Sequence, residues 1–153
     1  MNAENFAYVA GLIDGEGCIH LGVRKGTYRA RVTIGMTETA RPLLESLREE
    51  WGGSLYLLRP ATDRWQAAWT WSIQGEPAGR LLEAVAPYLR LKAEQARLAL
   101  AVETVRRELP RRPNGSGSWT STGRARCEEI KQQMHALNRK GPGTGYATTA
   151  EVG

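Results

Sequence analysis

Residues 8–17 read YVAGLIDGEG, and this stretch decides how the rest of the chain is interpreted. It belongs to a helical pattern in which small residues recur at every fourth position, namely Ala3, Ala7, Gly11 and Gly15. Residues four apart lie on one face of a helix, and a stripe of small side chains lets two helix backbones approach closely. Because Gly in a helix interior costs about 1 kcal/mol relative to Ala, Gly11 indicates a packing requirement.

Two acidic residues, Asp14 and Glu16, close the same stretch. The C-terminal end of a helix carries partial negative charge, so carboxylates are unfavourable there, and a local conflict of this kind often marks a functional site. If two copies of the helix packed together, their carboxylates would meet. A divalent cation, which prefers oxygen ligands, would relieve the repulsion between them.

The chain is basic, with 21 Lys and Arg against 16 Asp and Glu and a net charge of +5. Its isoelectric point is about 9.6, and a value above ~9 is a reason to consider nucleic acid as the partner. The distribution of charge is more informative. Between Gly17 and Thr37 lie Arg24, Lys25, Arg29 and Arg31, with no acidic residue. This segment therefore predicts a surface of one sign.

Length and composition fit one domain, because 153 residues with 41% hydrophobic side chains are typical of a compact fold. We expect a single domain over residues 1–140 and a flexible tail over 141–153. No apolar run approaches the ~20 residues of a membrane span, and the N-terminus lacks the basic segment of a signal peptide. We therefore expect no membrane partner and no secretion. Cys18 and Cys127 make no disulfide framework, which favours a reducing compartment. We expect the cytoplasm, bacterial or phage, or an organelle.

Hydrophobic periodicity predicts an α+β fold in which two strand hairpins alternate with helices. The expected elements are a helix over 4–14, strands over 18–24 and 29–34, a helix from Thr37 or Thr39 to the Gly pair 52–53, strands over 54–59 and 65–74, a helix from Pro77 to about Pro87, a long helix over 91–109, a flexible loop over 110–123 and a last helix over 124–138. The four strands would form an antiparallel sheet with helices on one face. Its other face would be concave and basic, a shape that suits a DNA groove.

Strand alternation selects the side chains on that basic face. In the first hairpin these are His20, Arg24, Arg29, Arg31 and Thr33, and in the second Ser54, Tyr56, Gln66, Thr70 and Ser72, with Arg59 and Arg64 near its turn. A strand ribbon in the major groove can deliver Arg to guanine and Gln to adenine. We expect Lys25, Arg139 and Lys140 to bind phosphates, which position the protein without specifying sequence.

Several segments of the chain resemble a known family. Val9–Gly17, VAGLIDGEG, is similar to the nine-residue signature of the LAGLIDADG homing endonucleases, with Gly15 in place of Ala and Glu16 at the position of the family's metal-binding acid. The segments PLLESL, WGGSLY, PYLRLKAEQA and LNRKG also resemble family blocks. The resemblance covers about residues 5–141.

The resemblance implies an αββαββα fold and a Mg²⁺-dependent endonuclease. Such an enzyme cuts long, near-palindromic sites in double-stranded DNA and leaves 3′ overhangs. Family members with a single motif act as homodimers, and this chain has one motif. The small-residue stripe is then implied to be the dimer interface, with Ala7, Gly11 and Asp14 in contact with the second copy. A mobile intron or a free-standing gene would encode such a chain.

The resemblance also implies roles for individual residues. Glu16 and the carbonyl of Gly15 would hold the metal beside the scissile phosphate. Lys92, in LRLKAEQA, matches the family's active-site lysine and would stabilise transition-state charge or orient the water. The chain departs from the family at Gly35-Met36-Thr37, where members often place Gln or a similar polar residue, so the residue that positions the water is unassigned.

Two other functions use the same fold. One is an RNA maturase that binds intron RNA and assists splicing without cutting DNA, and the other is a regulator that binds DNA without cutting it. Neither function needs the acid at Glu16 or the lysine at Lys92, and the presence of both residues favours the endonuclease.

Overall fold

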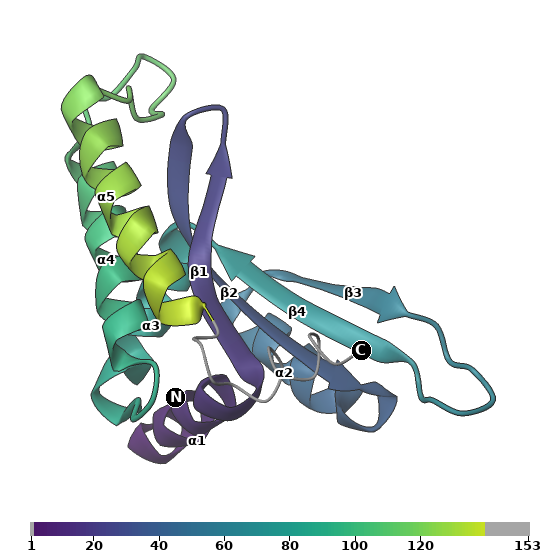
Figure 1. The fold of residues 1–153 in the computed structure, drawn as a ribbon. Coiled ribbons are helices and arrows are strands. Elements are labelled where there is room, and N and C mark those ends of the chain that lie inside the picture. The colour runs from purple at the N-terminus through teal and green to yellow at the C-terminus, as the bar shows by residue number, and fades with distance from the viewer. Residues whose placement is uncertain (1, 140–153) are drawn as a thin grey trace, which may run out of the picture.

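The computed structural model of the protein describes residues 2–139, and the predictions for Lys140 and the tail at 141–153 lie outside them. Along the chain the elements are α1 (Ala3–Glu16), β1 (Gly17–Arg24), β2 (Thr27–Thr37), α2 (Arg41–Trp51), β3 (Ser54–Arg59), β4 (Ala68–Gln74), α3 (Glu76–Val85), α4 (Ala93–Glu108) and α5 (Ser121–Asn138) (Figure 1). Short 3₁₀ turns, η1 (Glu38–Ala40) and η2 (Ala86–Tyr88), precede α2 and follow α3. None of the helices described here has the length and apolar character needed to cross a membrane.

The four strands form one antiparallel sheet in the order β1-β2-β4-β3. This arrangement confirms the predicted α+β class. β1 pairs with β2 from Gly17↔Ile34 to Arg24↔Thr27. β4 pairs with β2 only from Arg31↔Gln74 onward, so the tip of the first hairpin extends past the end of β4.

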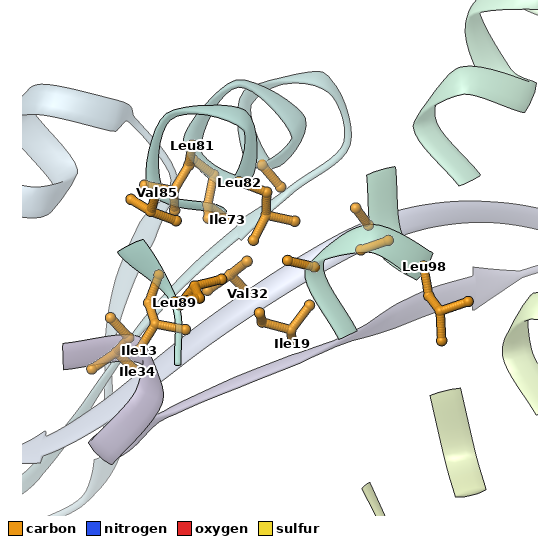
Figure 2. Packing of buried hydrophobic residues seen from close by; sticks show 14 of the residues in the cluster. Ile13, Ile19, Val32, Ile34, Ile73, Leu81, Leu82, Val85, Leu89 and Leu98 are labelled. Carbon is orange, nitrogen blue, oxygen red and sulfur yellow. The ribbon is translucent and has the colours of Figure 1, made fainter. Parts of the chain in front are cut away.

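The core lies between one face of the sheet and the helices (Figure 2). Alternate strand residues are buried there, including Ile19, Val32, Ile34, Trp71 and Ile73, with exposed fractions of 1% or less. The helices contribute Ile13, Leu44, Leu81, Leu82, Leu98 and Ile130, among others, to the same cluster. Because side chains alternate along a strand, the residues between these point to the opposite, polar face of the sheet.

The turn between α2 and β3 depends on glycine. Gly52 and Gly53 have φ angles of 87° and 88°, in the left-handed region that favours Gly. A Cβ atom on Gly53 would lie 2.5 Å from the carbonyl oxygen of Ser72. The Gly pair that we expected to end the second helix therefore also lets β3 approach β4.

Three predictions of the fold need correction. The strand predicted over 65–74 begins only at Ala68, because residues 60–67 form a loop in which Trp65 is 62% exposed. The last helix begins at Ser121 rather than 124, since the Thr120 hydroxyl caps it by accepting a hydrogen bond from the Gly123 N–H at 3.0 Å. The loop at 110–123 contains a turn closed by backbone hydrogen bonds, among them Ser118 N–H to the Pro110 carbonyl at 2.7 Å.

A β-bulge in β3 changes which side chains reach the polar face. Leu57 pairs with Trp69, whereas Arg59 pairs with Ala68, so Leu58 is the extra residue. Strict alternation would place Arg59 on the same face as Leu57, toward the helices. The bulge instead sets Arg59 opposite Ala68, which shares the polar face with Thr70.

Candidate nucleic-acid interface and carboxylate site

The polar face of the sheet brings together most of the side chains that strand alternation selected. His20 pairs with Arg31 across β1 and β2. Thr33 and Ser54 both pair with Ser72, and Tyr56 pairs with Thr70. Two hollows of about 330 and 420 Å³ open on this face, and both are lined by Arg31 and Gln74. The first also includes Arg24 and Arg29, and the second Ser54, Tyr56 and Ser72. The face is therefore continuous across all four strands.

His20 and Arg31 form the centre of the face. Burial and the nearby positive charge of Arg31 lower the pKa of His20 below its ordinary value of 6.5, because both effects disfavour the protonated imidazole. The Nδ1 atom of His20 is buried and has no hydrogen-bond partner in the described chain. Arg31 Nε donates to the Ser72 hydroxyl at 3.2 Å, which orients the guanidinium along the sheet.

The glutamine on the polar face is Gln74 and not the predicted Gln66. Gln66 lies in the loop before β4, and its side-chain oxygen accepts hydrogen bonds from the N–H and the hydroxyl of Thr39, the latter at 2.8 Å. Gln66 therefore holds the loop to the η1 turn before α2 and is not a strand residue. Gln74 was missed by the sequence interpretation, yet it is exposed at the end of β4 and lines both hollows. The alternation of Thr70, Ser72 and Gln74 was the signal that could have identified it.

The end of α1 is held by a reciprocal contact between Asp14 and Lys92. The Asp14 carboxylate accepts hydrogen bonds from the backbone N–H groups of Arg90, Leu91 and Lys92 at 2.8, 3.1 and 3.0 Å. The Lys92 ammonium in turn donates to the carbonyls of Ile13, Asp14 and Gly17 at 2.8, 3.0 and 2.5 Å. A cation at this position also compensates the negative end of the helix dipole.

This contact, which we call the Asp14–Lys92 lock, gives both residues a structural role, while the interface role of Asp14 and the catalytic role of Lys92 stay predictions. All three donors of the Lys92 ammonium are used within the chain, and the Asp14 carboxylate is engaged with the segment before α4. Asp14 is therefore not a free carboxylate facing a second helix. The sequence conflict of an acid at a helix C-terminus is resolved here, because that acid binds the backbone of a different element.

Glu16, by contrast, is exposed and makes no hydrogen bond or ion pair within residues 2–139. The lock fixes the backbone on either side of it. Gly17 follows directly, and a Cβ atom there would lie 2.9 Å from the backbone of Ile13, so only Gly allows the chain to turn into β1. The structure thus presents one unpaired carboxylate at the base of the basic sheet.

A single copy of the chain offers few ligands for a metal ion. Across residues 2–139, no three His, Cys, Asp or Glu side chains gather in a way that could hold one. The Glu16 carboxylate and the adjacent Gly15 carbonyl are hard oxygen donors, and Mg²⁺ commonly binds one or two carboxylates together with substrate phosphates and water. These residues fit such an ion once a phosphate, or a second copy of the chain, adds the remaining ligands.

The face of α1 that carries the small residues is exposed. Ala3, Ala7, Gly11 and Gly15 all lie on the surface, whereas Val9, Ala10 and Ile13 on the opposite side are buried. A Cβ atom on Gly11 or Gly15 would have nothing within 4 Å. The packing requirement inferred from Gly11 is therefore not met inside the described chain.

The strand end at Gly35-Met36-Thr37 offers little polar chemistry. Gly35 pairs with Thr70 on the polar face, and Met36 packs against the core. A Cβ atom on Gly35 would lie 3.7 Å from the Thr70 hydroxyl. The hydroxyl of Thr70 in β4 therefore borders the space that a side chain at Gly35 would fill.

Comparison with known proteins identifies the fold. No protein-family model and no curated protein matches the chain in sequence. Among solved structures, the chain is similar to the homing endonuclease I-CvuI bound to its DNA target in the presence of Ca, with a TM-score of 0.69, 20% identity, and coverage of 98% of this chain and 92% of that one. A second structure of I-CvuI, with DNA not cleaved in 2 mM Mg, has a TM-score of 0.68 and 21% identity over 92% of this chain and 86% of that one.

Two further structures extend this likeness. The archaeal intron-encoded homing endonuclease I-Vdi141I, in complex with DNA, has a TM-score of 0.67 and 14% identity over 97% of this chain and 94% of that one. The LAGLIDADG meganuclease I-AabMI, bound to uncleaved DNA, has a TM-score of 0.67 and 19% identity over 98% of this chain but only 50% of its own. The chain therefore has the fold of the LAGLIDADG homing endonucleases, as the signature at Val9–Gly17 predicted.

Proposed function

We propose that this protein is a site-specific endonuclease that binds double-stranded DNA on the polar face of its sheet and cuts it with a divalent cation, most simply Mg²⁺. The observation that carries the proposal is the unpaired Glu16 carboxylate at the base of that face. An exposed carboxylate that has no partner in the described chain is available as a ligand, and it suits a site whose missing ligands come with a phosphate and a cation.

The length of the sheet supports a long recognition site. β1 has eight residues, which span about 27 Å at ~3.4 Å per residue. DNA rises about 3.4 Å per base pair, so one copy of the chain covers roughly eight base pairs between Glu16 and the hairpin tip. Arg31 and Gln74 at the centre of the face provide the donors and acceptors that read base edges, while Arg24, Lys25 and Arg29 add charge near the tip.

We propose that the active form is a homodimer joined through the small-residue face of α1. The exposed stripe of Ala7 and Gly11 supports this, because its close-packing capacity is unused in the described chain. So does the likeness to I-AabMI, since this chain aligns with half of that protein. Two copies related by a two-fold axis would place two Glu16 carboxylates together and would read a near-palindromic site.

The chemistry is phosphodiester hydrolysis. A bound divalent cation would polarise the scissile phosphate and help to activate a water. Glu16 and the Gly15 carbonyl would hold that cation, and the Asp14–Lys92 lock would keep both in a fixed position at the base of the sheet. The Lys92 ammonium, whose donors bind the Ile13, Asp14 and Gly17 carbonyls, would act on the phosphate through its charge alone, from its place beside the residue that follows Glu16. Hydrolysis across the minor groove by two such sites would leave 3′ overhangs.

The test is a cleavage selection on a randomised palindromic duplex library, with Mg²⁺ or with EDTA. Wild type should enrich cut ends of one sequence in Mg²⁺ and none in EDTA, and mapping of the ends should reveal 3′ overhangs. Glu16→Gln should bind the selected duplex but not cut it, because the charge that holds the cation is lost while the sheet is unchanged. Glu4→Gln, an equal change of charge at the other end of α1, is the matched control and should cut normally.

Three results would count against the proposal. Cutting by Glu16→Gln would show that another group holds the cation. Metal-independent enrichment of bound but uncut duplex would identify a DNA-binding regulator. Binding of structured intron RNA without duplex binding would identify a maturase. A monomer at micromolar concentration in sedimentation would separately contradict the homodimer.

A further inference from the structure

The tip of the β1–β2 hairpin extends beyond the rest of the sheet. Pairing between β2 and β4 stops at Arg31↔Gln74, so residues 22–29 are paired only with each other, as the rise of this hairpin above β4 shows (Figure 1). An isolated two-stranded ribbon is marginally stable at best. The tip nevertheless carries Arg24, Lys25 and Arg29, which read or position DNA only if their place is fixed.

Helix α5 supplies fixed points for this tip. The Tyr28 hydroxyl donates a hydrogen bond to Glu128 Oε2 at 2.7 Å, and Arg124 Nε donates to the Gly26 carbonyl at 3.2 Å. Arg124 and Glu128 are four residues apart and lie on one face of the helix, about 6 Å along its axis. Gly26 lies in the turn between β1 and β2, and Tyr28 is the second residue of β2. One turn of α5 therefore contacts both the turn and the start of the following strand.

Neighbouring groups strengthen the contact between Tyr28 and Glu128. The Tyr28 side chain is only 7% exposed, and its ring lies 5.6 Å from that of Trp119. The hydrogen bond from the Tyr28 hydroxyl, with those from Gln132 and Lys131, lowers the pKa of the Glu128 carboxyl, so the carboxylate is the form that accepts them. Further along β2, the buried Glu103 of α4 accepts the Ala30 N–H at 2.8 Å, on the edge that β4 no longer covers.

We propose that Arg124 and Glu128 of α5 are positioning residues for DNA recognition, which hold the hairpin tip so that Arg24, Lys25 and Arg29 meet the outer part of each half-site. This inference rests on the proposed function. It assigns to α5, which lies away from the polar face, a part in selecting the outer bases.

Two variants change the central contact: the first removes it with little other change, and the second weakens it and also removes the ion pair with Lys131. Tyr28→Phe keeps the ring and removes only the hydroxyl, and Glu128→Gln removes the charge of the acceptor. Glu129→Gln is the matched control, because it makes the same change of charge on the next residue of α5, which pairs only with Arg126 at 3.3 Å within the described chain. Both Glu variants raise the net charge by one, so a general electrostatic effect on DNA binding would be equal in the two.

The experiment is a binding selection on the randomised duplex library with each variant, and Arg29→Ala defines which base positions the hairpin tip reads. Tyr28→Phe and Glu128→Gln should reduce base discrimination about tenfold at those positions and leave the inner positions unchanged, while Glu129→Gln should match wild type. Hydrogen exchange of the free proteins should show faster exchange at the amides of residues 24–29 in the same two variants.

Several outcomes would overturn the inference. Wild-type discrimination in both variants, or unchanged exchange at residues 24–29, would show that α5 is not needed to hold the tip. An equal loss of discrimination at all positions would indicate a general structural role. If wild type itself selects no duplex, then the proposed function fails first, and with it any role of α5 in recognition.

Discussion

The Asp14–Lys92 lock predicts a specific loss of stability when its cation is removed. In Lys92→Met the aliphatic stem is retained, so packing changes little, but the carbonyls of Ile13, Asp14 and Gly17 lose the ammonium that joins them. Met cannot replace any of these hydrogen bonds. The Asp14 carboxylate still joins α1 to the segment before α4, but the side-chain link from that segment to the carbonyls of α1 and β1 is lost.

The size of the effect follows from the hydrogen bonds that Lys92 makes. A hydrogen bond contributes about 0.5–1.5 kcal/mol net, more when one partner is charged, and a cation at a helix C-terminus contributes about 0.3–1 kcal/mol. Lys92 is only partly buried, so water replaces some of these bonds in the variant. We therefore expect Lys92→Met to lower the free energy of unfolding by about 2 kcal/mol, within a total stability of roughly 5–15 kcal/mol.

Urea unfolding followed by circular dichroism measures this directly. With a slope of about 2 kcal/mol per molar, the midpoint of Lys92→Met should fall by about 1 M at an unchanged slope. The control is Arg90→Met, which removes an equal charge from the same segment, where only the backbone N–H of Arg90 contacts Asp14. It should change stability by less than about 0.5 kcal/mol. Equal midpoints for the two variants would refute the lock as a stabilising element.

Three other perturbations test the Gly pair, His20 and the basic face. Gly53→Ala should destabilise the fold by more than about 2 kcal/mol and Gly52→Ala by about 1 kcal/mol. Both residues have positive φ, but only at Gly53 would a Cβ atom meet a neighbouring carbonyl at 2.5 Å; thermal unfolding that ranks them equally would contradict this. Because burial and Arg31 lower the pKa of His20, the folded state binds fewer protons than the unfolded state as the pH falls below ~6.5. Stability should therefore decline from pH 7.5 to pH 5.5, and His20→Gln should show a smaller decline in urea midpoint, whereas an identical profile would argue against an unprotonated imidazole in the sheet. DNA binding should weaken steeply with salt. Lys25→Asn, a substitution compatible with the φ of 50° at this turn, should reduce the slope of log affinity against log salt by about 0.9 for each phosphate that the protein no longer neutralises. An unchanged slope would show that Lys25 does not contact DNA.

Regular strands made the first hairpin predictable from sequence. In β1 and β2, apolar and polar residues alternate without interruption, and the structure buries Ile19, Val32 and Ile34 while Arg29 and Arg31 line the opposite face. Period-two alternation is reliable here because one face is buried, so a shift by one residue would expose the entire apolar set. The small-residue face of α1 was also predictable, because helical spacing alone places Gly11 on a different face of the helix from Val9 and Ile13.

The second hairpin shows where such reasoning stops. Nothing in SLYLLR marks Leu58 as an extra residue, and yet the bulge decides that Arg59 faces the polar side. A bulge depends on how two strands pair, which alternation within one strand cannot reveal. Trp65 and Gln66 were also predicted to lie in a strand, because they continue the alternation of residues 68–74. The backbone pairing of β4 nevertheless begins only at Ala68.

The Asp14–Lys92 lock was hidden by distance along the chain. The two residues are separated by 78 positions, and each alone has an ordinary interpretation, an acid at a helix end and a lysine before a helix. Resemblance to a family placed Lys92 near the active site but did not show that its three donors bind the backbone of α1. Contacts of this kind require the fold, because they depend on the C-terminal end of α1 and the N-terminal end of α4 meeting in space.

The first hairpin is fixed at both of its ends by the second half of the chain. At its base, Lys92 binds the Gly17 carbonyl beside Glu16, and at its tip, Glu128 and Arg124 hold Tyr28 and Gly26. A hairpin that is anchored only at the base would let its tip bend, and the distance from the carboxylate to the outer basic residues would vary. With both ends held, that distance is constant. The proposed endonuclease must relate the bases it reads to the bond it breaks, and the two anchors on one hairpin, provided by Lys92 before α4 and by α5, would supply that relation.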